Sequence, residues 1–205
     1  MNKGKKPREP WEIVKNMTDP WSSVIICLGA NLPLRTDSAD DTLRKAIARL
    51  AQEGVSVDAV SRFFLTPCFP AGAGPDYVNA AITATSRMSP DILLQLLHEI
   101  ETEFGRNRKT RWGQRTLDLD LIAFGDRILP DLEGYHAWES LPVDRQQLSA
   151  PDRLVLPHPR MQDRAFVLVP LMDIAPDWRH PVSGLTIRTM VAALPEADID
   201  AVRPL

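Results

Sequence analysis

Leucine and aspartate alternate from Leu117 to Leu121, and this alternation restricts the fold more than any other feature of the chain. Successive side chains of a β-strand point to opposite faces of the sheet. The leucines can therefore enter a core, while Asp118 and Asp120 face the other side. Two carboxylates on one face repel each other unless a positive charge, such as a divalent cation, lies between them. The pattern predicts a strand with a metal-binding face; a solvent-facing strand edge is the simpler alternative.

A cluster of cationic residues lies directly before this strand, between Arg106 and Arg115. One guanidinium group can bind two phosphate oxygens at once. Arginines beside two carboxylates therefore suit a polyphosphate that carries a divalent cation. We therefore predict phosphoryl transfer from a nucleotide. The alternative is a basic loop that faces solvent or binds nucleic acid weakly. Trp112, within the cluster, is either a core anchor or a lid over a flat ring.

Charge and cysteine content argue against several other classes of protein. A formal net charge of -3 over 205 residues does not suit a general nucleic-acid coat protein, which would be basic. Cys27 and Cys68 show no metal-ligand spacing and suggest no disulfide framework, which favours a reducing cytoplasm. The basic N-terminus is followed by no secretory apolar segment, and no apolar run is long enough to cross a membrane. We expect a cytoplasmic protein that binds small molecules, with no nucleic acid or membrane partner.

The order of the predicted elements indicates the fold class. Apolar positions recur along the chain at the spacing typical of a strand or of a helix, and Pro90 marks the start of the second helix. The elements are a strand at 23–28, a helix at 39–53, strands at 55–64 and 77–85, a helix at 90–104, and the strand of the two aspartates. This β-α-β-β-α-β order predicts an α+β fold with a ferredoxin-like core, in which both helices pack on one face of an antiparallel sheet.

The remaining segments are expected to extend this core. Residues 1–21 are predicted to form a flexible N-terminal extension, and residues 22–205 a single domain. Further helices are expected at 164–174 and 186–194. Residues 126–150 are predicted to form an irregular, polar surface insertion.

Three smaller patterns allow both a functional and a structural interpretation. Tyr77 and Asn79 share one face of a strand, where a ring and an amide could bind a flat heterocycle or simply pack across strands. His98 and Glu101 lie three residues apart on a helix, and their spacing alone favours an ordinary polar face. His158 lies between two prolines and is either a site residue or a structural loop histidine.

Four segments of the chain occur in the order found in a known enzyme family. Over residues 23–181 the chain resembles the 6-hydroxymethyl-7,8-dihydropterin pyrophosphokinases of folate biosynthesis. The matching segments are Cys27-Leu-Gly-Ala-Asn-Leu32; Thr66-Pro67 with Tyr77-Val-Asn79; Glu101…Gly105-Arg-x-Arg108…Arg111-Trp-Gly-x-Arg115-Thr-Leu-Asp-Leu-Asp120; and Pro157-His158-Pro…Arg164-x-Phe166. The segment from Arg115 to Asp120 is a specific signature of the family.

The resemblance implies transfer of the β,γ-pyrophosphoryl group of ATP to the hydroxymethyl group of the pterin, with release of AMP. It implies that Asp118 and Asp120 hold two Mg²⁺ ions and that Arg106 and Arg115 act on the transferring group. The nucleotide would be bound by His98, Glu101, Arg108, Arg111, Trp112, Arg153, His158 and Arg164. The pterin would be bound by Thr66, Pro67, Cys68, Phe69, Tyr77, Asn79, Trp112 and Phe166.

The chain also departs from the family pattern, and two rival functions remain open. Gln114 stands where the family usually has proline, and Cys68 and Phe69 occupy a stretch that is often prolyl and aliphatic. One rival is a single-stranded RNA-binding module, because ferredoxin-like sheets with aromatic and basic residues also bind RNA. The net acidity and the carboxylate pair count against it. The other is a magnesium-dependent phosphotransferase that acts on a different planar alcohol.

Overall fold

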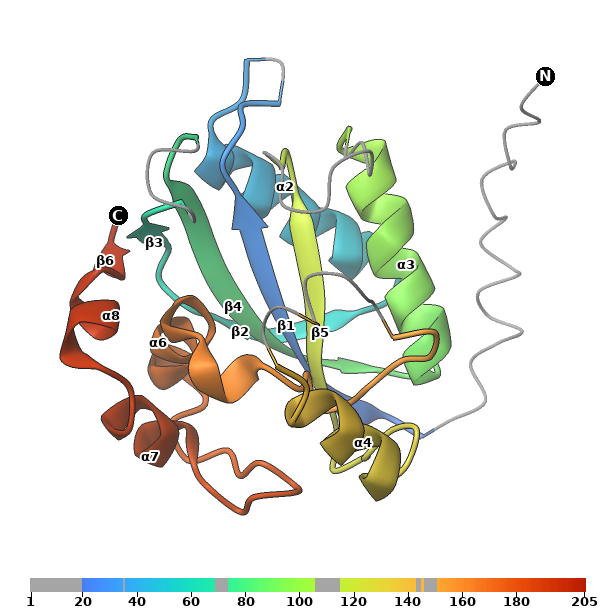
Figure 1. Ribbon diagram of the computed structural model, residues 1–205. Coiled ribbons are helices and arrows are strands. Elements are labelled where there is room, and N and C mark those ends of the chain that lie inside the picture. The colour runs from blue at the N-terminus through green and yellow to red at the C-terminus, as the bar shows by residue number, and fades with distance from the viewer. Residues whose placement is uncertain (1–19, 35, 69–73, 106–114, 143–144, 146–150) are drawn as a thin grey trace.

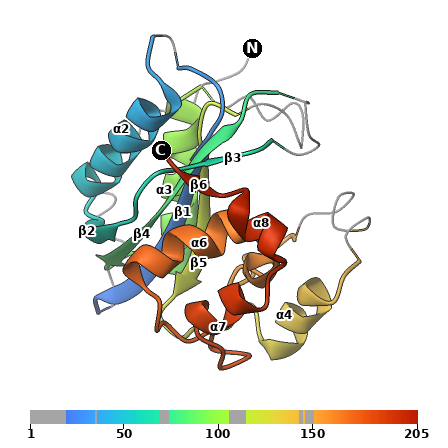
Figure 2. The same ribbon diagram turned by 90° about the vertical axis from the view of Figure 1, so that its left-hand side faces the viewer.

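The computed structural model describes residues 20–34, 36–68, 74–105, 115–142, 145 and 151–205. These residues form an antiparallel sheet with helices on both of its faces (Figures 1 and 2). Its strands are β1 (Ser22–Ala30), β2 (Ser56–Val60), β3 (Phe64–Thr66), β4 (Tyr77–Ser86), β5 (Asp118–Phe124) and β6 (Arg203–Pro204). The helices are α2 (Ala39–Gln52), α3 (Pro90–Glu103), α4 (Leu132–Glu139), η1 (Met161–Asp163, 3-10), α6 (Ala165–Ile174), α7 (Ile187–Ala192) and α8 (Glu196–Asp200).

The strands lie in the order β5-β1-β4-β3-β6, and β2 also pairs with β4. The predicted class, a mixed α+β protein with an antiparallel sheet, is therefore confirmed. Within the described ranges, every helix is too short or too polar to span a bilayer.

Helices α2 and α3 cover one face of the sheet (Figure 2). Leu43 of α2 and Leu97 of α3 are fully buried there, in one cluster with Leu119 of β5. Both helices begin where the sequence predicts, because the hydroxyl oxygens of Ser38 and Ser89 each accept a backbone N–H of the first turn. The leucine face of β5 is therefore a core face, as the alternation predicts.

Helices α6 and α7 cover the opposite face of the sheet. Val167 of α6 and Ile187 of α7 pack in one cluster with Ile25 and Cys27 of β1. Burial raises the pKa of the Cys27 thiol, and the nearby Asp120 carboxylate adds to this effect. Cys27 is therefore a small buried apolar residue, and Cys68 is also buried.

The single strand expected at residues 55–64 is wrong, because the chain breaks there into β2 and β3. Both short strands pair with β4. Ser61 lies at the break, where its hydroxyl oxygen accepts the Ala81 N–H (2.9 Å) and its O–H donates to the Arg62 carbonyl (2.7 Å). In a continuous strand, the Ala81 N–H and the Arg62 carbonyl would be available for backbone pairing between strands. Here the Ser61 side chain binds both of them. The edge strand β6, paired with β3, is a further element that the sequence did not indicate.

The described part of the predicted insertion at 126–150 is more regular than expected. It contains α4, and Tyr135 on this helix is fully buried. The base of the insertion is closed by an isolated bridge, in which Leu129 and Leu156 exchange backbone hydrogen bonds of 2.9 and 3.1 Å. An aromatic residue buried this completely anchors the helix, so this part of the insertion is packed against the domain.

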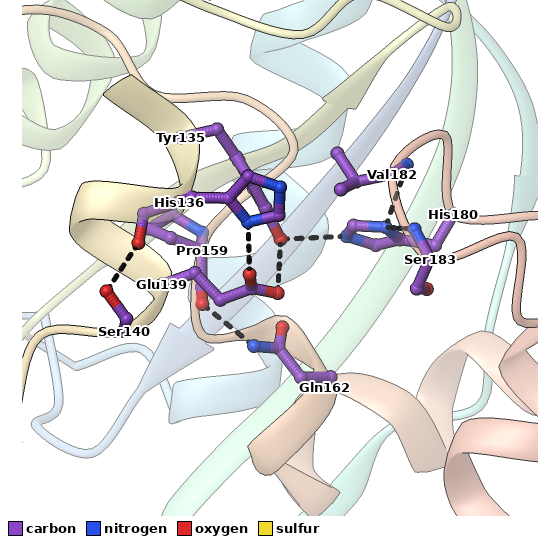
Figure 3. A network of polar contacts seen from close by, with 9 residues as sticks. All are labelled: Tyr135, His136, Glu139, Ser140, Pro159, Gln162, His180, Val182 and Ser183. Atoms are coloured by element: carbon purple, nitrogen blue, oxygen red, sulfur yellow. Dashed lines mark hydrogen bonds and ion pairs between the residues drawn. The ribbon is translucent and has the colours of Figure 1, made fainter. Parts of the chain in front are cut away.

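A chain of polar contacts joins α4 to the loop before α7 (Figure 3). His180 Nδ1 accepts the backbone N–H groups of Val182 (3.3 Å) and Ser183 (3.2 Å), so the neutral ring carries its proton on Nε2. Nε2 then donates to the Tyr135 hydroxyl (3.2 Å), which donates to Glu139 (3.3 Å). Sequence analysis assigned no role to His180, yet its side chain is among the most deeply buried polar groups described.

The lowered pKa values of His180 and His158 predict a pH-dependent stability. Burial lowers the pKa of His180 against the opposing effect of Glu139, and burial followed by the charge of Arg164 lowers that of His158 to about 3. Both groups bind a proton more weakly when folded, so stability is complete above their unfolded pKa of about 6.5 and falls with the pH below it. The limiting slope is about 1.4 kcal/mol per pH unit for each histidine. The free energy of unfolding, measured with denaturant at several pH values between 7.5 and 5, tests this dependence.

Two variants separate His180 from other titrating groups in this experiment. His180→Asn keeps a side-chain acceptor but cannot titrate in this range, so we expect a shallower dependence of unfolding free energy on pH. His136→Asn is the control, because His136 is exposed and also contacts Glu139 (2.9 Å). An unchanged slope in His180→Asn would contradict the assignment.

Candidate active site

Asp118 and Asp120 lie at the beginning of β5, on the sheet face opposite to α2 and α3. Both side chains are partly exposed, while the intervening Leu119 is buried in the core. Across the sheet, Asp118 pairs with Gly29 and Asp120 pairs with Cys27 of β1. The structure therefore brings the two carboxylates to one face, as the alternation predicts.

Arg115 forms an ion pair with Asp118 three residues later. Burial disfavours the charged guanidinium, but the Asp118 carboxylate, with a smaller contribution from Asp120, outweighs this and raises the pKa of Arg115. A fixed positive charge therefore lies beside the carboxylate pair. This is the arrangement expected where negative phosphate oxygens are to be bound next to metal-binding carboxylates.

The backbone of Arg115 is held by the segment that follows β1. Its N–H donates to Asn31 Oδ1 (2.8 Å), and its carbonyl accepts the N–H groups of Asn31 (3.0 Å) and Leu32 (3.2 Å). Asn31 Nδ2 in turn donates to the carbonyl of Pro75 (3.0 Å). Asn31 lies in one of the segments that match the family, but the sequence alone gave it no role; an asparagine that directly follows a buried strand was the available signal.

The residues predicted to read the pterin lie on the neighbouring strands. Asn79 of β4 and Thr66 of β3 are both buried, and Asn79 Nδ2 donates to Thr66 Oγ1 (2.5 Å). Tyr77, two residues before Asn79, is partly exposed. Cys68 is buried and its Sγ donates to the Gly74 carbonyl (3.0 Å), whereas Pro67 is exposed.

Register places the carboxylates and the amide side by side. Gly29 of β1 pairs with Asp118 of β5 on one side and with Asn79 of β4 on the other. Neighbouring strands lie about 4.8 Å apart, so the Cα atoms of Asp118 and Asn79, two strands apart, are separated by roughly 10 Å. A small flat molecule at Asn79 can thus present one end to the carboxylates.

Glu101 corrects the expectation of an ordinary polar face on α3. Its side chain is only 1% exposed, and Oε1 accepts the backbone N–H of Leu119 (2.8 Å). This bond ties α3 to the strand of the two aspartates. His98, one turn earlier on the helix, is partly exposed.

His158 lies beside the same strand, because its N–H donates to the Ile122 carbonyl (2.8 Å). Its Nδ1 accepts the N–H of Arg160 (3.1 Å), which leaves the proton of the neutral ring on Nε2. The pKa of about 3 means that the ring is neutral near pH 7. Arg164 precedes α6 and its guanidinium carbon lies 5.6 Å from the ring centre of Phe166, which is 39% exposed.

Some predicted site residues are not brought into this arrangement. Arg153 is exposed, and the structure gives it no described contact with the site. Outside the described residues lie Phe69, Arg106, Arg108, Arg111 and Trp112.

A separate pocket of about 500 Å³ shares none of the predicted site residues. It lies beside η1, α7 and α8, and its lining residues include Gln162, Met190 and Asp198. The convergence of charged and amide groups on the sheet face, rather than the size of a hollow, therefore identifies the candidate site.

The donor set on β5 fits a cation that is bound together with phosphate. Within the described ranges, no group of three or more histidine, cysteine, aspartate or glutamate residues could hold a metal ion. Two carboxylates are an incomplete set for Mg²⁺, which usually keeps waters and takes further oxygens from substrate phosphates. The ion pair of Asp118 with Arg115 also shows that positive charge is accommodated at this point.

Comparison with known proteins finds relatives of this chain. Relatives named 2-amino-4-hydroxy-6-hydroxymethyldihydropteridine pyrophosphokinase include one from Synechocystis sp., 42% identical over 166 residues, which are 80% of this chain and 73% of the relative. Another, from Pseudomonas aeruginosa, is 36% identical over 177 residues, covering 86% of this chain and 94% of the relative.

Among solved structures, wild-type Plasmodium falciparum HPPK-DHPS resembles the fold with a TM-score of 0.59 at 14% identity. The similarity covers 90% of this chain but 46% of that one, so this chain spans less than half of its length. At this identity the likeness concerns the fold alone. Residues 25–176 match the 7,8-dihydro-6-hydroxymethylpterin-pyrophosphokinase (HPPK) family, and the chain belongs to that family.

Proposed function

We propose that this protein transfers the pyrophosphoryl group of ATP to the hydroxymethyl group of 6-hydroxymethyl-7,8-dihydropterin, a reaction of folate biosynthesis that releases AMP. The observation that carries the proposal is the row formed by Asp118, Gly29 and Asn79 on adjacent strands. It puts a carboxylate and an amide on one sheet face, which supports a phosphate-handling role for the first and a pterin-reading role for the second. The ion pair of Arg115 with Asp118 adds the positive charge that a transferring phosphoryl group needs.

The pterin would lie against β4. Tyr77 and Phe166 would enclose its ring, and Asn79 with the segment from Thr66 to Phe69 would read its polar edge. The hydrogen bond from Asn79 to Thr66 fixes the amide orientation, which leaves Asn79 Oδ1 as an acceptor for the ring. Trp112 would close over the bound substrates.

The nucleotide would lie between β5, α3 and the segment of His158. Neutral His158 can donate from Nε2, and Arg164 can pair with a phosphate oxygen. Arg106 and Arg115 would act on the transferring group. The other proposed contacts come from His98, Glu101, Arg108, Arg111 and Arg153.

Asp118 and Asp120 would hold two Mg²⁺ ions, which when bound would neutralise phosphate charge and help to activate the pterin hydroxyl. In the reaction the hydroxyl oxygen bonds to the β-phosphorus, the bond from that phosphorus to the α,β-bridging oxygen breaks, and the hydroxyl proton is released. Such a transfer requires little covalent chemistry from the protein, so positioning and charge supply most of the acceleration.

We also propose that the core follows the ferredoxin-like path. The order β5-β1-β4 with β2 beside β4, and α2 and α3 on one face, supports this. A single domain over residues 22–205 with an extension at 1–21, and a cytoplasmic location, remain predictions.

The reaction is tested by mixing the protein with ATP, magnesium and the pterin and separating the nucleotides by chromatography. We expect AMP to form in step with the pterin diphosphate, and a chelator to abolish both. ADP in place of AMP would indicate a simple phosphotransferase. No turnover, together with RNA binding by the folded protein, would favour the RNA-binding alternative.

A further inference from the structure

Asn31 joins two segments that border the candidate site. Its side-chain oxygen accepts the N–H of Arg115 (2.8 Å), and its amide nitrogen donates to the carbonyl of Pro75 (3.0 Å). These partners are 84 and 44 residues away in the sequence. The side chain is 6% exposed, so breaking either bond would leave a largely buried polar group without its partner.

The bonds fix the backbone from which the Arg115 side chain starts. Both the N–H and the carbonyl of Arg115 are bonded to the segment of Asn31 and Leu32. With its Cα held in this way, the guanidinium is directed at Asp118. The bond to Pro75 similarly holds the chain two residues before Tyr77, where β4 begins.

We propose that Asn31 is a positioning residue for pyrophosphoryl transfer. It acts through Arg115, whose charge it places beside Asp118, and through Pro75 it sets the start of the strand that carries Tyr77 and Asn79. The inference rests on the proposed function. A misplacement of about 1 Å in a reacting group can lower a rate by about a hundredfold, so the loss of these bonds affects turnover more than nucleotide binding.

The first test compares Asn31→Ala with Ser61→Ala. Ser61 is the matched control because it is also 6% exposed and also bonds two backbone groups, but it lies at the break between β2 and β3. We expect Asn31→Ala to lower kcat for AMP formation by roughly ten- to a hundredfold, with little change in the Kd for ATP. Ser61→Ala is expected to lose stability and keep its kcat. Wild-type kcat in folded Asn31→Ala would overturn the inference.

A double-mutant cycle then tests whether Asn31 acts through Arg115. If it does, Asn31→Ala adds little to the loss of kcat already caused by Arg115→Ala. Losses of kcat that multiply would overturn the route through Arg115.

Asn31→Asp replaces the alanine variant if the latter does not fold. Aspartate keeps an acceptor for the Arg115 N–H but cannot donate to the Pro75 carbonyl, so we expect a higher KM for the pterin. Normal kcat and KM in this variant would also overturn the inference. If the unmodified protein forms no AMP, the proposed function and the inference fail together; normal turnover of the Asn31 variants defeats the inference alone.

Discussion

Replacing Asp120 by asparagine is expected to lower kcat by on the order of a thousandfold while the protein stays folded. The side chain lies partly exposed on the sheet face opposite to α2 and α3, so the nearly isosteric amide fits the same space. An amide cannot supply the negative charge that balances a divalent cation beside phosphate. Steady-state AMP formation at saturating ATP, magnesium and pterin measures the loss.

Asp58→Asn is the matched control for this variant. It makes the same change of charge on an exposed position of β2, in the same sheet but away from the candidate site. We expect its kcat to equal that of the unmodified protein. Full turnover in Asp120→Asn would remove the main support for a metal site on β5.

Local periodicity accounts for most of what the sequence predicted about the fold. The helix expected at 39–53 is α2 at Ala39–Gln52, and the one expected at 90–104 is α3 at Pro90–Glu103. Both carry a cap residue and an apolar stripe that faces the sheet, so local and tertiary preferences agree. The alternation that defines β5 is equally local, because the period of a strand alone decides which side chains share a face.

The errors arose where distant partners decide the structure. Residues 55–64 are apolar enough for one strand, but the chain breaks near Ser61, whose side chain bonds the distant Ala81. Glu101 has helical spacing suited to a polar face, but its partner is a backbone N–H of β5. Tyr135 and His180 meet across 45 residues, and neither has a local pattern that indicates the other.

In the candidate site, too, the sequence reveals residues that form short local patterns but not those whose role depends on distant partners. The carboxylates, the arginine cluster and the pair Tyr77 and Asn79 could be found from the sequence because each is a short pattern of chemically distinct residues. Asn31 and Gly29 could not be assigned a role from chemistry alone. Their importance depends on strand register, which brings Gly29 between Asp118 and Asn79.

Replacing Gly29 by alanine is expected to weaken pterin binding by roughly ten- to a hundredfold, as loss of one well-placed buried hydrogen bond would. A Cβ at this position would lie 2.8 Å from Asn79 Oδ1 and 3.8 Å from Tyr77 Cδ1. Asn79 cannot turn away freely, because its Nδ2 is bonded to Thr66 (2.5 Å) and both residues are buried. The amide must shift or lose this bond, and with it the orientation that would read the pterin.

Equilibrium titration with the pterin and, separately, with ATP measures this effect, since we expect the Kd for ATP to change little. Asn79→Ala provides the background that isolates the cause. Without the Asn79 amide the added methyl group has no atom to displace, so Gly29→Ala should then weaken pterin binding little further. Unchanged pterin affinity in Gly29→Ala alone would mean that Asn79 does not read the ring. An equal loss of pterin affinity in both backgrounds would instead mean that the added methyl group acts through the backbone of β1. Asn79 would then not explain why this strand carries glycine between the carboxylate and the amide.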